Sequence, residues 1–310
     1  MKKVLITGAT GFIGSWVVQD MLDHDVQVVA VVREKSSHMD CLPEKGVTVV
    51  ECSLEDYDRL PLLVHDRDMD AVYHFAWQGV SDSDIRRPDI QLKNVEAVLK
   101  LIEAMPRPGC STFIGAGSLH EIESFYEMRE DKPINNLGYM YKAAKLSAHW
   151  MGKALAGSKG IRFFWPVISN TYGVGEVSKR LVNSVIRQII GGKVPALSAG
   201  TQNYDFVYIS DVAKAFRLIG EKGRDGSNYL IGSGAARPLK EYLQIAGDVT
   251  NRICGSDIPL GFGRVTSNVV HLPYEVFDIS SLVNDTGYQA SVPFPEGIEH
   301  TVRWLQQNAM

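Results

Sequence analysis

The chain has 310 residues, of which 45% are hydrophobic and 22% are charged, an ordinary balance for a globular protein with one or two cores. Its formal net charge of −4 lacks the basic excess of nucleic-acid-binding proteins, so we expect no nucleic-acid partner. The four cysteines form no C-x-x-C pair and no run of 18 apolar residues occurs, so we expect free thiols, no metal site, no membrane span and a cytoplasmic protein.

Short apolar runs alternate with helix-period segments through the first half of the chain, which is typical of βαβ units around a parallel sheet. The predicted strands are Val4–Thr7, Gln27–Val32, Thr48–Glu51, Ala71–Phe75, Thr112–Ala116 and Arg162–Val167. The predicted helices between them are Ile13–Leu22, Leu54–Val64, Ile90–Met105 and Tyr141–Ala156.

Beyond residue 170 the pattern becomes a mixed region rich in Gly and Pro. Here we predict a strand at Phe206–Ile209 and helices at Leu181–Ile190, Asp211–Ile219, Leu239–Val249 and Gly297–Gln307. The sequence therefore predicts an α/β protein, with a Rossmann-type doubly wound parallel sheet and a smaller mixed α/β C-terminal lobe.

The first predicted strand runs directly into a glycine-rich loop and then a helix. Gly8 allows a tight turn, Gly11 lets a pyrophosphate approach the backbone, and Gly14 lets the helix pack closely on the strand. The N–H groups and the dipole of the helix start favour a negatively charged ligand. The loop predicts a dinucleotide-binding site made by Gly8, Thr10, Gly11, Phe12, Ile13 and Gly14.

The second strand ends in Val31-Val32-Arg33-Glu34. An acidic residue at this place binds the ribose hydroxyls of NAD, whereas an arginine accommodates the 2′-phosphate of NADP. Arg33 therefore favours NADP, and Glu34 keeps NAD as the alternative. A solvated charge pair at a strand end is the plain structural interpretation.

A tyrosine and a lysine four residues apart share one face of a predicted helix, at Tyr141 and Lys145. The other side carries an apolar stripe of Ala143, Leu146, Trp150 and Ala154. A nearby ammonium group favours the phenolate form of tyrosine, so Tyr141 can exchange a proton with a carbinol oxygen as hydride moves. Ser118 follows the strand Thr112–Ala116 and could orient the same oxygen, or it could simply cap the next turn.

Together these motifs resemble the extended branch of the short-chain dehydrogenase/reductases, and within it the NAD-dependent epimerase/dehydratase family that acts on nucleotide sugars. The resemblance rests on the G-x-x-G-x-x-G loop and on further segments at Asp70–Ala76, Asn94, Asn170–Gly173, Gly200–Val212, Asp278–Ser280 and Gly287-Tyr288. It implies a catalytic trio of Ser118, Tyr141 and Lys145. It also implies cofactor contacts from Phe75, Ala76, Asn94, Tyr141 and Lys145, besides the glycine loop.

The resemblance implies substrate contacts from Ser118, Asn170 and Tyr204, and the loop that begins at Trp77 could line the nicotinamide pocket. We place an NAD(P)-binding domain at residues 1–168 plus 204–232 and a substrate-binding lobe at 169–203 plus 233–310. The helices near residues 90–105 and 141–156 would pair in a homodimer.

The chain departs from the family pattern at several positions. Dehydratases carry Asp-Glu directly after the catalytic Ser/Thr, where this chain has Leu119-His120, which argues against 4,6-dehydration. Decarboxylating relatives favour Glu at the place of His120. Two arginines that neutralise the substrate diphosphate are replaced by Tyr204 and Asn268. Either the substrate is not a nucleotide diphosphate, or other cations compensate, for which the candidates are Arg86, Arg87, Lys179 and Arg180.

Three functions fit these residues. The first is reduction, with NADPH, of the 4-keto group of a nucleotide-linked (deoxy)sugar. The second is 4-epimerisation of a nucleotide sugar with tightly bound NAD, and the third is reduction of a non-nucleotide ketone or aldehyde. A non-catalytic dinucleotide sensor would not need the proton relay of Ser118, Tyr141 and Lys145. His74, within a buried strand pattern, is predicted to be a hydrogen-bonded core residue.

Overall fold

The computed structural model describes residues 1–34, 36, 39–65, 68–80, 83–105, 110–129, 137–267 and 269–308, so Asn268 lies outside the described residues. The chain divides into two compact units. Unit 1 comprises Met1–Ile168, Ala213–Tyr229 and Ser281–Tyr288. Unit 2 comprises Ser169–Val212, Leu230–Ser280 and Gln289–Met310. The assignment of cofactor binding to one part and substrate binding to the other stays a prediction.

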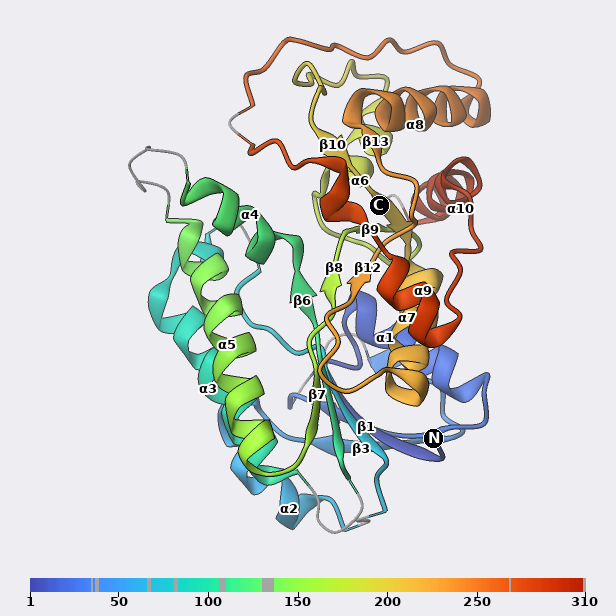
Figure 1. Cartoon of the computed structure of the whole chain (residues 1–310). Coiled ribbons are helices and arrows are strands. Elements are labelled where there is room, and N and C mark those ends of the chain that lie inside the picture. Colours follow the sequence, from blue (N-terminus) through green and yellow to red (C-terminus); the bar gives the residue numbers. More distant parts are fainter. Residues whose placement is uncertain are drawn as a thin grey trace. The chain divides into compact units, whose positions relative to one another are not determined.

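Unit 1 is built on a six-stranded sheet in the order β3-β2-β1-β4-β5-β7 (Figure 1). All neighbouring strands are parallel: β1 (Lys3–Thr7), β2 (Gln27–Val32), β3 (Val47–Glu51), β4 (Ala71–His74), β5 (Thr112–Gly115) and β7 (Arg162–Phe164). The strand order reverses between β1 and β4, and ligands of doubly wound sheets bind at the carboxyl ends of strands at such a point. The predicted α/β doubly wound fold is confirmed.

One face of this sheet is covered by α3 (Pro88–Ala104) and α5 (Tyr139–Ser158), which pack side by side (Figure 1). The predicted helix Leu54–Val64 is wrong as a single helix, because the segment forms η2 (Leu54–Arg59), which is kinked at Asp56, followed by the short α2 (Leu60–Leu63). Pro61 explains why an α-helix begins here and does not continue from η2, since proline removes one helical hydrogen bond and is tolerated only in a first turn.

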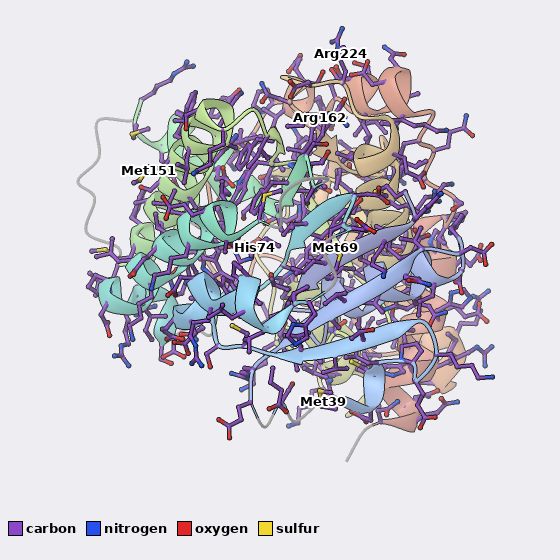
Figure 2. All side chains as sticks on the ribbon, turned by 90° about the horizontal axis from the view of Figure 1, so that it is seen from below. Met39, Met69, His74, Met151, Arg162 and Arg224 are labelled. Atoms are coloured by element: carbon purple, nitrogen blue, oxygen red, sulfur yellow. The ribbon has the colours of Figure 1, made fainter. Side chains whose placement is uncertain are left out.

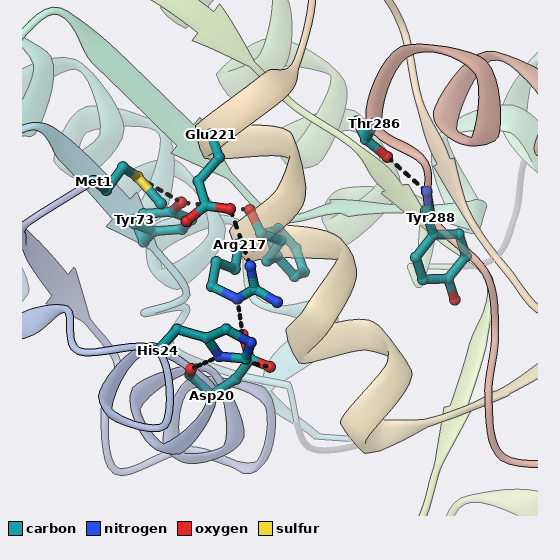
Figure 3. A network of polar contacts seen from close by, with 9 residues as sticks. Met1, Asp20, His24, Tyr73, Arg217, Glu221, Thr286 and Tyr288 are labelled. Atoms are coloured by element: carbon teal, nitrogen blue, oxygen red, sulfur yellow. Dashed lines mark hydrogen bonds and ion pairs between the residues drawn. The ribbon is translucent and has the colours of Figure 1, made fainter.

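The other face packs against α1 (Phe12–Leu22) and the part of α7 (Ile209–Lys222) that belongs to unit 1. Arg217 of α7 donates to Asp20 of α1 at 2.7 Å and to Glu221 at 2.9 Å, and its side chain is only 9% exposed (Figure 3). Gly220 is required where α7 crosses the sheet, because a Cβ there would lie 1.9 Å from the Tyr73 hydroxyl oxygen. This close packing fixes α7 on the sheet.

Short elements complete unit 1. β6 (Gly117–Ser118) pairs in parallel with β8 (Val167–Ile168), and α4 (Leu119–Glu127) follows β6. The predicted strand Arg162–Val167 is therefore interrupted, because Pro166 has no N–H to donate to a ladder. The remaining elements are η1 (Met39–Cys41), η3 (Asp84–Arg86) and α9 (Ser280–Thr286).

Unit 2 combines short strands with longer helices. β9 (Asn170–Tyr172) pairs in parallel with β11 (Phe206–Tyr208), and β10 (Asn203–Tyr204) pairs in antiparallel fashion with β13 (Arg237–Pro238). Aromatic rings of Tyr172, Phe206, Tyr242 and Phe294 form its core. Its other elements are α6 (Leu181–Ile190), β12 (Leu230–Ile231), α8 (Leu239–Cys254), η4 (Tyr274–Phe277) and α10 (Phe294–Gln307).

All four cysteines are free thiols. Within the described ranges, no helix combines the length and the apolar character that a membrane span requires.

Candidate active site

The glycine loop lies where β1 and β4 end side by side. Gly8 has a φ of +68°, and a Cβ there would lie 2.5 Å from the Ala76 nitrogen. A Cβ on Gly14 would lie 2.1 Å from the Gly8 carbonyl oxygen. Gly11 is the N-cap of α1 without a side-chain capping bond, so the first N–H groups of the helix are not capped by that residue. This side-chain-free cradle at a helix start fits the pyrophosphate of a dinucleotide.

The end of β2 lies beside this loop. The hydroxyl oxygens of Thr10 and Ser36 are 3.1 Å apart, which links the loop to the segment that follows β2. Arg33 and Glu34 are both exposed at the end of that strand, and Phe12 and Ile13 of the loop are partly buried. Sequence reasoning missed Ser36, since a lone serine after a strand carries no signal of its own.

Two amides of α3 fix the loop that follows β4. Asn94 is buried and both donates to the Gln78 carbonyl at 2.9 Å and accepts from the Gln78 N–H at 2.8 Å. Gln91 accepts from Trp77 Nε1 at 3.0 Å and donates to the Gly79 carbonyl at 2.9 Å. Asn94 therefore acts on this loop directly, and Gln91 is a residue that sequence reasoning missed. The available sequence signal for Gln91 was a second amide side chain three residues before Asn94, on the same face of the helix.

Phe75 and Ala76, the residues between β4 and Trp77, are both partly buried. The Phe75 ring packs edge-on against Phe216 of α7, with ring centroids 4.7 Å apart. Ala76 provides the backbone nitrogen against which Gly8 packs.

The structure brings Tyr141, Lys145 and Trp77 together. Lys145 Nζ donates to the Ala116 carbonyl at 2.9 Å and lies 3.6 Å from the Trp77 ring centroid. The Tyr141 ring meets the Trp77 ring edge to face, with centroids 6.0 Å apart. A cation over an indole face is attracted by the ring quadrupole, so Trp77 holds the amine of Lys145 in place.

Ser118 stands at the start of α4 and caps it. Its hydroxyl oxygen accepts from the His120 N–H at 3.3 Å, and Glu121 Oε1 accepts from the Ser118 N–H at 2.8 Å. The capping alternative raised from the sequence is thus real. β6 and α4 both contact α5, which carries Tyr141, and the catalytic role of Ser118 stays a prediction.

Glu121 is a buried carboxylate that bonds to the backbone of Ser118, and sequence reasoning missed it. Besides Ser118, it accepts from Trp165 Nε1 at 3.0 Å and pairs with His149 Nδ1 at 3.1 Å. Three hydrogen bonds satisfy this otherwise costly buried charge. The spacing Ser-x-x-Glu of a capping box was the available signal.

Burial changes the acidity of two groups in this region. It lowers the pKa of Lys145 to about 7, although the Glu121 carboxylate opposes the shift. It also lowers the pKa of His74 to about 3, with a further contribution from Lys145. His74 Nδ1 lies 2.8 Å from Thr7 Oγ1 among the strands of the sheet (Figure 2), so the predicted hydrogen-bonded core role is confirmed. Its Nε2 is buried without a hydrogen-bond partner among the described residues.

Unit 2 holds the two predicted substrate residues Asn170 and Tyr204. Asn170 donates through its backbone and its side chain to the Asp205 carbonyl, at 3.0 and 3.4 Å. Tyr204 is partly buried and stacks on Phe206. Directly opposite Tyr204 in the β10–β13 pair stands Arg237, and opposite residues of a strand pair point to the same face. Sequence reasoning missed this guanidinium because the strand pairing was not visible.

Two of the four basic residues that the sequence offered as partners for a substrate diphosphate already lie close to acidic side chains. Arg87 pairs with Asp89 at 2.7 Å, and Arg180 lies 3.7 Å from Glu176. Arg86 and Lys179 are exposed.

The profile of the NAD dependent epimerase/dehydratase family matches residues 4–232. The chain belongs to this family. A dTDP-glucose 4,6-dehydratase of Mycobacterium tuberculosis is 28% identical over 99% of this chain and 94% of the relative. The mouse dTDP-D-glucose 4,6-dehydratase is 25% identical over 99% of this chain and 89% of its own length.

Solved structures of epimerases share the fold of this family member. A UDP-glucose 4-epimerase of Thermotoga maritima, solved with UDP-glucose, superposes with a TM-score of 0.79 at 23% identity, over 99% of this chain and 100% of that one. A UDP-N-acetylglucosamine 4-epimerase of Methanobrevibacter ruminantium gives a TM-score of 0.80 at 24% identity, over 99% of both chains. The predicted resemblance to the epimerase/dehydratase family is confirmed.

Proposed function

We propose that this protein reduces the 4-keto group of a nucleotide-linked (deoxy)sugar with NADPH. The observation that carries the proposal is the cluster of Tyr141, Lys145 and Trp77 on α5 and the loop after β4, in the same unit as the glycine cradle. Support for the substrate class comes from the relatives, whose names specify dTDP- and UDP-linked sugars.

The roles of the residues follow from their chemistry. Gly8, Gly11 and Gly14 would hold the pyrophosphate, and the nicotinamide, when bound, supplies the hydride. Tyr141 donates a proton to the carbonyl oxygen of the substrate, and an ammonium on Lys145 stabilises the phenolate that remains. The Ser118 hydroxyl can donate to the same oxygen while its lone pair still accepts from the His120 N–H.

The residues after Ser118 favour reduction over dehydration. Leu119 is buried and apolar, so it cannot supply the acid that dehydratases carry at this place. The exposed guanidinium of Arg33 is suited to the 2′-phosphate of NADPH.

A second candidate is a nucleotide-sugar 4-epimerase with bound NAD. Glu34 favours it, because this exposed carboxylate next to Arg33 could bind the ribose hydroxyls of NAD. Solved relatives of the same fold were obtained with NAD, among them a UDP-glucose 4-epimerase of Thermus thermophilus.

The assay that separates the candidates is incubation with UDP- and dTDP-linked 4-keto-6-deoxyhexoses and with the corresponding 4-hydroxy sugars. Consumption of one NADPH per ketone reduced supports the reductase. Interconversion of 4-hydroxy epimers without net consumption of added cofactor contradicts it and supports the epimerase.

Replacing Tyr141 by Phe tests the catalytic assignment. We expect Tyr141→Phe to bind NADPH as the wild type does and to lose most turnover, about 100-fold or more, because the proton donor is gone. Steady-state kinetics and a fluorescence titration of NADPH measure the two effects. Tyr139→Phe, on the same helix, is the matched control, and near-normal turnover by Tyr141→Phe contradicts the assignment.

Two further parts of the proposal concern the substrate diphosphate and a second copy of the chain. We propose that Arg237 neutralises the substrate diphosphate in place of the arginine that Tyr204 replaces.

We also propose a homodimer through α3 and α5. Apolar side chains that these helices expose support it: Leu92 at 67%, Trp150 at 61% and Met151 at 49%.

A further inference from the structure

The carboxylate of Glu121 is buried at the start of α4 and contacts more than the helix end that it caps. Its side chain is only 3% exposed. Oε1 accepts from the Ser118 N–H at 2.8 Å and from Trp165 Nε1 at 3.0 Å, and Oε2 lies 3.1 Å from Nδ1 of His149. A cap on the protein surface needs only the first of these contacts. The other two tie the carboxylate to the segment after β7 and to α5.

The groups around Glu121 are those that an ionised carboxylate requires. A backbone N–H and an indole N–H can only donate, and both meet at Oε1, so this oxygen carries no proton. The His149 ring can donate from Nδ1 to Oε2 as a third N–H group. Charge-assisted hydrogen bonds of this kind compensate a buried carboxylate for the loss of hydration. Glu121 is therefore a negative charge held inside unit 1.

The indole of Trp165 contacts both this carboxylate and the amine of Lys145. Its Nε1 donates to Glu121, and Lys145 Nζ lies 5.5 Å from its ring centroid. Two glycines make room for the ring: a Cβ on Gly115 would lie 2.2 Å from Trp165 Cε3, and one on Gly117 would lie 3.0 Å from Trp165 Cδ1. The backbone that leads to Ser118 is thus shaped around the residue that joins Glu121 to Lys145.

Ionisable groups lie around Lys145 on three elements. Burial lowers the pKa of this amine to about 7, and Glu121 of α4 acts in the opposite direction. His74 of β4 is buried with a pKa of about 3, so it is neutral at physiological pH. On α5 itself, Tyr141 lies one turn before Lys145 and His149 one turn after it, and His149 is bonded to Glu121. Glu121 therefore supplies a negative charge that balances the amine.

A second group of charges on α4 and α5 is paired within itself. Lys142 Nζ lies 3.3 Å from Glu123 Oε2 and 2.6 Å from Glu127 Oε2, and His120 Nδ1 lies 2.5 Å from Glu123 Oε2. Glu127 thus resembles Glu121 in belonging to α4 and bonding to a residue of α5, but its partner is Lys142. It provides the matched control for Glu121.

We propose that Glu121 is a positioning residue of the catalytic trio, which fixes the backbone of Ser118 and keeps the amine of Lys145 protonated as its counter-charge. The inference rests on the proposed function for the roles of Ser118 and Lys145, through which Glu121 acts. An ammonium stabilises the phenolate that remains on Tyr141 after proton transfer. Loss of the Glu121 charge weakens this step although all three groups of the trio are still present.

Replacing Glu121 by Gln removes the charge and keeps the hydrogen bonds. The amide oxygen still accepts from Ser118 and Trp165, and the amide nitrogen can donate to His149. NMR of protein labelled with ¹³C at lysine Cε follows the ionisation of Lys145, whose signal is the one missing from Lys145→Met. An opposite charge favours the ammonium, so we expect the titration midpoint of Lys145 to fall by about one pH unit in Glu121→Gln. Glu127→Gln should leave it unchanged.

The pH profile of turnover separates positioning from a merely structural role. Reduction needs the protonated amine, so kcat/KM declines as pH rises through the pKa of Lys145. In Glu121→Gln this decline begins about one pH unit lower, which gives a loss of about tenfold at pH 8 and a smaller loss at pH 6. A variant that is only destabilised loses turnover equally at both pH values. Thermal unfolding of each variant shows whether it is folded.

A measurement on the wild type keeps the inference testable if Glu121→Gln does not fold. The ¹³Cδ shift of Glu121 should be that of an ionised carboxylate at pH 7, as a counter-charge requires. A protonated Glu121 at pH 7 overturns the inference, as does an equal Lys145 midpoint in the wild type and a folded Glu121→Gln. If the midpoint shifts as expected but the wild type reduces no nucleotide-linked 4-keto sugar, the proposed reductase is overturned and the coupling of Glu121 to Lys145 stands.

Discussion

At the scale of single residues, the site depends on charges that the fold removes from water. Lys145 is buried with its amine over the Trp77 ring, and its pKa falls from 10.5 to about 7. Glu121 is the carboxylate that opposes this fall. An amine balanced near neutrality can be shifted toward its charged form by a developing negative charge next to it, which is what a phenolate on Tyr141 would provide.

The depressed pKa of Lys145 predicts how stability depends on pH. Below pH 7 the amine is protonated in both states, so the folded protein bears the full cost of a buried charge. Between about pH 7 and 10 the unfolded chain holds the proton that the folded chain has lost, so the cost declines as pH rises. Lys145→Met removes this cost, and its effect on the free energy of unfolding should be more favourable at pH 6 than at pH 9 by about 3 kcal/mol.

Denaturant unfolding at the two pH values measures this difference. Lys45→Met, at an exposed lysine, is the control and should show no such dependence. If Lys145→Met changes the free energy of unfolding equally at pH 6 and pH 9, the pKa of Lys145 is not depressed.

At the scale of elements, the glycine loop works because β1, β4 and α1 approach more closely than side chains allow. Gly14→Ala places a Cβ 2.1 Å from the Gly8 carbonyl oxygen, where only backbone could give way. We expect weaker NADPH binding and a loss of about 1–3 kcal/mol in the free energy of unfolding. Gly157→Ala in α5 meets no atom within 4 Å and is the control. Unchanged NADPH affinity in Gly14→Ala would refute the cradle.

The β10–β13 pair makes a second prediction at this scale. Arg237 shares a face with Tyr204, where the family carries an arginine, so the charge is expected to act from the neighbouring strand. Arg237→Gln should raise KM for a nucleotide sugar about tenfold, because a charge-assisted contact is lost, while kcat changes little. Arg252→Gln, at an exposed arginine of α8, is the comparison variant. Equal KM values for wild type and Arg237→Gln would rule out this contact.

At the scale of the whole molecule, the side chains of the apolar stripe predicted on the helix of Tyr141 are mostly exposed to solvent. Ala143, Trp150 and Ala154 are exposed, and the buried face of α5 instead carries Ala144, Lys145, Ala148, Gly152 and Ala156. Met151 also lies on the outside of α5 (Figure 2). Exposed apolar side chains gathered on adjacent helices are typical of an interface.

Trp150→Glu tests the proposed homodimer. A carboxylate at this position would be buried without a partner in a helix-to-helix interface, so we expect a monomer in light scattering coupled to size-exclusion chromatography. Leu62→Glu, at a 74% exposed leucine of α2, should leave the dimer intact. A wild type that elutes as a monomer at all concentrations contradicts the proposal.

The sequence by itself determined the doubly wound sheet, the glycine loop and the spacing of Tyr141 and Lys145. These features are local: alternating apolar runs, a turn that only glycine can make, and two residues one helical turn apart each leave a pattern over a few neighbouring positions. The helix bounds were also close, as at α6, where the predicted Leu181–Ile190 is observed.

Only the tertiary structure decided which distant residues act together. Trp77 under Lys145, Glu121 between Ser118 and His149, and Arg237 opposite Tyr204 are contacts between segments that no local pattern connects. The burial that depresses the pKa of Lys145 likewise arises only when α5 packs on the sheet and excludes water. Sequence periodicity records which face of an element is apolar, whereas the partner of that face is set by packing of the whole chain.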